Sequence, residues 1–141
     1  MVDTIDALGF TGAVDVTPPW EPAAGTDLKL AIDNGGIACA WGPPNTDSGV
    51  VVYWVPVDDA LWAEASAVWE GEGTGAMDVA GLDEDAAYFT FVGAGVDGNE
   101  FSRWELNLRF NGLWIQVATS AWEDPTAGNA VVQTALDVAT P

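Results

Sequence analysis

Apolar and polar residues alternate along the first half of the chain in runs that predict β-strands. Between Asp27 and Asp33, the large apolar residues Leu28, Leu30 and Ile32 stand at every second position, which is typical of a strand with one buried face. The Asn34-Gly35-Gly36 sequence then predicts a turn into a return strand, in which Ile37, Cys39 and Trp41 continue the apolar side. The next run, Val50 to Val55, is apolar on both faces and is therefore expected to be a central strand.

The second half repeats this alternation. Strands are predicted over Ala87–Val92 and Phe101–Phe110, the latter with apolar residues at alternate positions. Asn111-Gly112 is the strongest hairpin signal in the sequence and leads into a strand over Leu113–Thr119. Trp41 and Trp104 are 63 residues apart, as are the strands that follow them, so the pattern indicates two related half-repeats.

Three helices are predicted from the 3.6-residue period and from end signals. A short one covers Asp3–Leu8 with Asp3 or Thr4 as N-cap, and a closing one covers about Pro125–Val138. The third begins after Asp58 as N-cap and runs to about Glu70. Its expected buried stripe consists of Leu61, Trp62, Ala65, Val68 and Trp69.

Together these elements predict a single acidic α+β domain over residues 1–141. Connections between strands are mostly too short for parallel crossovers, so we expect an antiparallel sheet of about five to seven strands with helices packed on one face. The two halves would then be ββ(β)α units. Residues 10–26, which include Pro18, Pro19 and Pro22, are expected to form an irregular proline-rich lead-in.

Charge excludes several classes of function. The 22 acidic residues face only Lys29, Arg103 and Arg109, and the formal net charge is −19. Such a surface repels nucleic acids and anionic membranes, because no basic cluster is available to displace their counterions. With no histidine, a Ser-His-Asp triad is excluded and a transition-metal site is not expected.

The single cysteine, Cys39, allows no intrachain disulfide, and we interpret it as a packing residue on the inward side of its strand. No basic segment followed by an apolar one comes after Met1, so a signal peptide or lipid anchor is not expected in this chain.

The carboxylates suggest two kinds of chemistry. Paired carboxylates next to tryptophans could cleave glycans, although so many acids on a small surface form such pairs by chance. We expect no cofactor, and calcium is the candidate to consider against that expectation. It prefers several oxygen ligands, and two acidic stretches fall in predicted loops, although without EF-hand spacing. The candidate ligands are Asp83, Glu84, Asp85, Asp97, Asn99 and Glu100. The same stretches also fit a charged loop tip and a hairpin turn.

Seven of the eight tryptophans divide into two groups. Trp41, Trp62, Trp69 and Trp104 lie on the apolar sides of predicted strands and of a helix, so we expect them to pack in the core. Three others are less easily buried and could line a groove for sugars, peptides or an apolar ligand: Trp20, Trp54 and Trp122. The alternative is that they cover the ends of the core.

Two segments resemble a known family. They are Gly36-Ile37-Ala38-Cys39-Ala40-Trp41 and the stretch from Val79 to Phe89, which is similar to a Gly-x-Gly-Asp-x-Ala motif. Both resemble small envelope lipoproteins of actinobacteria. The resemblance implies an exported α+β domain, located outside the cell or in the envelope, and it assigns no functional residue.

These observations lead to one main hypothesis and one alternative. The main hypothesis is a non-enzymatic binding domain that uses an acidic surface and a Trp-lined groove, with a cationic protein segment or a cell-wall glycan as partner. The alternative is a carboxylate-dependent glycan-active or calcium-dependent domain. Halophilic adaptation or simple solubility would also explain the acidity.

Overall fold

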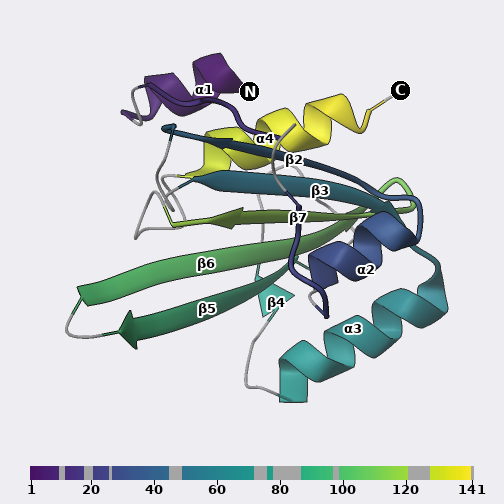
Figure 1. Cartoon of the computed structure of the whole chain (residues 1–141). Helices are drawn as coiled ribbons and strands as arrows, with labels where there is room; N and C mark the ends of the chain where they lie inside the picture. Colours follow the sequence, from purple (N-terminus) through teal and green to yellow (C-terminus); the bar gives the residue numbers. More distant parts are fainter. Residues whose placement is uncertain are drawn as a thin grey trace.

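The computed structural model describes residues 1–9, 12–17, 21–25, 27–44, 49–71, 76–77, 87–96, 99–120 and 128–140. For residues 27–28, 76–77, 87–96 and 99–102, the description covers the backbone. These residues form an antiparallel sheet with helices on both of its faces (Figure 1). The predicted α+β class with an antiparallel sheet is therefore confirmed.

The sheet has five longer strands and a two-residue strand at each edge. Its spatial order is β1-β2-β3-β7-β6-β5-β4. The bounds are β1 (Val14–Asp15), β2 (Ile37–Gly42), β3 (Val50–Pro56), β7 (Leu113–Thr119), β6 (Asn99–Phe110), β5 (Ala87–Val96) and β4 (Ala76–Met77). The strands predicted after residue 36 all exist, and β3 is central as expected because β2 and β7 pair with its two edges.

A tight turn sets the register of the β6–β7 hairpin. Asn111 and Gly112 both have positive φ, 51° and 75°, as a two-residue type I′ turn requires, and Phe110 pairs with Leu113 across it. The β7 strand then lies antiparallel to β3 over seven residue pairs, from Val50 opposite Thr119 to Pro56 opposite Leu113. This pairing joins the two halves of the chain.

The helices divide between the two faces of the sheet (Figure 1). On one side, here called the α4 face, α4 (Asn129–Val138) and α1 (Val2–Ala7) cover a core that contains Val52, Trp104 and Val117. On the other side, the α3 face, α2 (Asp27–Asp33) and α3 (Asp59–Gly71) cover a core around Tyr53 and Trp114. Successive side chains of β3 and β7 point to opposite faces of the sheet, so both strands contribute residues to both cores.

The expectation of helices on one face was therefore wrong. Strand β3 is apolar on both faces, so both faces of the sheet have to be buried. Helices therefore pack on each face and form a separate core there. The half-repeats are also not equivalent. The helix that follows β3 packs on the α3 face, whereas the helix that follows β7 packs on the α4 face.

The strand predicted over Asp27–Asp33 is also wrong, because this segment is helix α2. Seven residues are too few to separate a period of 2 from one of 3.6. The helix places Lys29 next to Asp33 as an ion pair one turn apart, and it leaves Leu30 exposed while Ala31 is buried against the sheet.

Most other helix predictions are confirmed. The Oδ1 atom of Asp58 accepts a hydrogen bond of 2.8 Å from the backbone N–H of Leu61, so Asp58 caps α3. In the predicted stripe, Trp62 and Trp69 are buried, but Val68 is 55% exposed. Helix α1 begins earlier than expected, after Met1, without a side-chain cap.

The closing helix is present as α4, which starts at Asn129; Asp124 and Pro125 lie outside the described residues. The lead-in predicted over 10–26 is described only in part, and within it the structure has the short strand β1. None of the helices in the described ranges is both long enough and apolar enough to cross a bilayer.

The four tryptophans expected in the core, Trp41, Trp62, Trp69 and Trp104, are all buried. On the α3 face, Trp62, Trp69 and Trp114 contact one another edge to face, with ring centroids 5.5 to 6.3 Å apart. Tyr53 joins Trp114 at 5.7 Å. Aromatic pairs in this geometry contribute about 0.5–1.5 kcal/mol each beyond their buried area, so the cluster fixes α3 on the sheet.

Candidate functional site: an apolar groove beside α4

An apolar groove of about 510 Å³ lies on the α4 face, between the end of α4 and strands β2 and β3. This volume is within the range of ligand sites in proteins. Its lining is almost entirely apolar and comes from the N-terminus, the turn before β2, strands β2, β3 and β7, and α4 with its C-cap: Met1, Gly35, Ile37, Cys39, Trp41, Trp54, Pro56, Leu113, Thr134, Val138 and Ala139.

Strand alternation produces the floor of the groove. Ile37, Cys39 and Trp41 occupy every second position of β2, so their side chains point to the same face. Trp54 lies opposite Ile37 on β3 and adds its indole to the same surface. The apolar alternation that predicted the strand is thus also the pattern that builds the groove.

One hydrogen bond holds the wall of the groove in place. The indole Nε1–H of Trp54 donates to the backbone carbonyl of Ala135 over 3.0 Å. Ala135 is in the last turn of α4, where carbonyls lack a partner within the helix. Trp54 therefore satisfies one of these carbonyls and fixes the end of α4 relative to the sheet, while its ring contributes to the lining.

The rim of the groove exposes apolar surface to solvent. The described part of the chain has five exposed large apolar side chains, and the two most exposed, Val138 at 69% and Ile37 at 65%, both line the groove. A single exposed apolar residue is ordinary, but here two of them border one apolar groove.

Cys39 is a half-buried thiol in the floor of the groove. Burial raises its pKa, and the nearby carboxylate of Asp15 raises it further, whereas a hydrogen bond with Thr17 acts in the opposite direction. Asp15 itself accepts a hydrogen bond of 2.9 Å from the backbone N–H of Thr17, and its pKa is lowered by Thr17. Cys39 is thus a packing residue, as expected, and a weak nucleophile.

This pKa predicts slow alkylation of Cys39 at neutral pH. The thiolate is the reactive form, so the rate with iodoacetamide should rise with pH later than that of an unperturbed thiol. In Asp15→Asn, loss of the negative charge stabilises the thiolate, so the rate profile should move to lower pH, while the amide oxygen can still accept from Thr17. Mass spectrometry against pH measures both profiles. Coincident profiles would show that Asp15 has no influence on the thiol.

The basic side chains all lie away from the groove. Lys29 is on α2, and Arg103 and Arg109 alternate on β6 with the buried Trp104 and Leu108, so they project to the α3 face. Each pairs with a carboxylate: Lys29 with Asp33, Arg103 with Glu105 at 2.9 Å, and Arg109 with Asp59 at 2.5 Å.

The α4 face, by contrast, carries carboxylates without basic side chains. None of the elements α1, β1, β2, β3, β7 and α4 contains a Lys or Arg. Asp3 and Asp6 on α1 and Asp137 on α4 are exposed there. The electrostatic potential around the groove is therefore expected to be negative.

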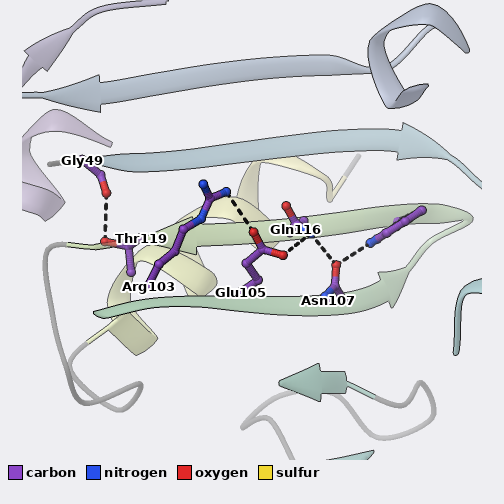
Figure 2. A network of polar contacts seen from close by, with 7 residues as sticks. Gly49, Arg103, Glu105, Asn107, Gln116 and Thr119 are labelled. Carbon is purple, nitrogen blue, oxygen red and sulfur yellow. Dashed lines mark hydrogen bonds and ion pairs between the residues drawn. The ribbon is translucent and has the colours of Figure 1, made fainter. Parts of the chain in front are cut away.

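The α3 face holds a buried polar network (Figure 2). The Oδ1 atom of Asn107 accepts hydrogen bonds from Trp114 Nε1 at 3.0 Å and from Gln116 Nε2 at 2.9 Å. Gln116 also reaches Glu105, which pairs with Arg103. Asn107 and Gln116 are almost fully buried, so the network links β6 to β7 beneath the aromatic cluster.

Of the three tryptophans predicted to line a groove, one is among the described residues. Trp54 lines the groove, whereas Trp20 and Trp122 lie outside the described residues. Sequence reasoning placed Trp41 in the core alone, yet Trp41 also lines the groove, and it did not single out Val138. No local signal marks Val138, because it continues the apolar stripe of Val131 and Ala135 on α4.

The predicted calcium ligands are not tested by the structure. Asp83, Glu84, Asp85 and Asp97 lie outside the described residues, and Asn99 and Glu100 are described as backbone of β6. Elsewhere in the described ranges, no three acidic or cysteine side chains are grouped so that they could hold a metal ion. Calcium binding stays a prediction.

Comparisons with known proteins give no match to a family model, to a curated protein or to a solved structure. The resemblance to small envelope lipoproteins therefore stays a prediction.

Proposed function

We propose that this protein is a non-enzymatic binding domain that receives an apolar group of its partner in the groove beside α4. The observation that carries the proposal is the coincidence of an apolar groove of about 510 Å³ with Ile37 and Val138, the two most exposed large apolar side chains in the described part of the chain. An extracellular or envelope location, as the sequence predicts, is compatible with this role.

The chemistry of the lining supports binding rather than catalysis. Polar side chains contribute only the hydroxyl of Thr134 and the thiol of Cys39. The Thr134 hydroxyl is already engaged with the carbonyl of Ala130 at 2.8 Å and with Thr4, and the pKa of Cys39 is raised. The lining thus offers apolar contact and no activated nucleophile.

A neutral apolar dye tests the proposal directly. Nile red should bind wild-type protein with increased fluorescence, and Ala139→Phe, which fills the groove from the end of α4, should weaken binding about tenfold because the apolar volume is occupied. Fluorescence titration at fixed salt gives both dissociation constants.

Ala67→Phe is the matched control. Ala67 is exposed on α3, on the opposite face, so this variant adds the same ring without entering the groove. Nile red should bind it as it binds wild type. Equal affinity of all three proteins, or no binding by wild type, would contradict the proposal.

A further inference from the structure

We infer that the partner segment in the groove is a short amphipathic helix with a basic polar face. This inference rests on the proposed function and adds the chemistry and the shape of the occupant. Three observations carry it: the spacing of α4 over the sheet, the length of the groove floor, and the distribution of charge between the two faces.

The groove lies on the α4 face, beside α4 and next to Met1 at the start of α1. Helix α4 packs on β7, and β2 lies two strands away, with β3 between them. Two strand spacings are about 9.6 Å, which matches the 8–10 Å between packed helices. Thr134 on this side of α4 already contacts Thr4 of α1. A helix laid over β2 and β3 beyond the start of α1 would therefore contact both the sheet and the end of α4 that carries Val138.

The floor of the groove sets the length of this segment. The lining residues of β2 run from Ile37 to Trp41, about 13 Å at the rise of a strand. A helix covers that distance in about nine residues. Two or three turns with apolar anchors at i, i+3, i+4 and i+7 would fill the groove, which is the usual way a helix docks into an apolar groove.

Open rims favour a peptide over a small molecule. A small ligand is normally buried over most of its surface, whereas Ile37 and Val138 leave the edge of the groove in solvent. A helix would cover these two side chains with its anchors and keep its polar face in water.

Charge complementarity selects a basic polar face. Every Lys and Arg side chain of the protein is on the α3 face and is paired there, while Asp3, Asp6 and Asp137 are exposed on the elements beside the groove. A cationic helix would be attracted to this face, and an acidic helix, or a second copy of this chain at net charge −19, would be repelled.

The test uses three designed peptides of equal length. The first is a 14-residue Leu–Lys peptide with helical spacing of leucine, the second has the same composition with strict alternation, and the third replaces Lys by Glu. Displacement of Nile red reports occupation of the groove. The helical Leu–Lys peptide should displace the dye at least about tenfold more tightly than either of the others.

Two charge variants show whether the peptide is attracted by the charges beside the groove or by the net charge of the whole protein. Asp137→Lys changes the groove face and Glu64→Lys changes exposed α3, and both change the net charge by the same amount. Asp137→Lys should weaken the helical Leu–Lys peptide about fivefold at low salt, and Glu64→Lys less than about twofold, because only the first charge is near the docked helix.

The outcomes distinguish the two proposals. If Nile red binds the groove but the acidic or the alternating peptide displaces it as well as the helical Leu–Lys peptide, the binding function stands and the basic helix is wrong. If both Lys variants weaken the peptide equally, attraction is global, and the inference also fails. If neither the dye nor any peptide binds, both proposals fail together.

Discussion

Replacing Trp104 by alanine is expected to lower the free energy of unfolding by about 3–5 kcal/mol, the loss typical of a large aromatic residue removed from a core. Trp104 is fully buried on the α4 face, where it belongs to the same core as Val131 and Val132 of α4. Typical domains are stable by about 5–15 kcal/mol, so the variant should be near the limit of folding. Urea denaturation followed by circular dichroism measures the change.

A paired substitution shows whether the packing around Trp104 is as tight as the structure indicates. A Cβ atom on Gly128 would lie 2.5 Å from Cζ2 of Trp104, so Gly128→Ala should itself destabilise the protein by about 1–3 kcal/mol. In a Trp104→Phe background the ring is smaller, and the same alanine should cost less. Additive effects of the two substitutions would contradict direct contact between these positions.

Replacing Asn107 by leucine is expected to lower the free energy of unfolding by about 2–5 kcal/mol, because two buried donors lose their acceptor at about 1–3 kcal/mol each. The donors are Nε1 of Trp114 and Nε2 of Gln116. The Nδ2 group of Asn107 is buried and has no partner among the described residues. Its removal therefore breaks no hydrogen bond and relieves the free-energy penalty of burying an unsatisfied donor. Denaturation of the leucine variant and wild type gives the difference.

The control is a double-mutant cycle with Gln116→Met. Once the donor of Gln116 is absent, Asn107→Leu should cost less than in wild type by about 1 kcal/mol, the ordinary value of a buried amide hydrogen bond. If Asn107→Leu costs the same in both backgrounds, the two amides do not interact energetically. Urea denaturation followed by circular dichroism at 25 °C, with matched protein concentrations, measures the free energy of unfolding in both backgrounds.

Elements that are specified by an unambiguous local pattern were predicted correctly. The two-faced apolar run of β3, the Asn111-Gly112 turn and the Asp58 cap each depend on a few neighbouring residues, and each is present as expected. Helix α2 was missed because a seven-residue segment with leucine at alternate positions satisfies both periods. Its helical state follows from packing, which buries Ala31 against Tyr53 and Val55.

The candidate site was predicted in part. The sequence indicated that Trp54 would be hard to bury, and Trp54 does line the groove. Its partners could not be found from the sequence, because Val138 and Ala139 are more than 80 residues away in the chain and reach Trp54 only through the packing of α4. The open position beside α4 depends on where two helices lie on the sheet, which no local pattern encodes.

The sequence by itself determined the acidity, the absence of histidine chemistry, the α+β class and most of the strands, since these depend on composition and on short-range periodicity. Only the tertiary structure decided which face each helix covers, and with it the location of the groove and the separation of the paired basic residues from the carboxylates beside it. The physical reason is that alternation along a strand specifies two faces without specifying what packs on either, and that choice is made by contacts between distant segments.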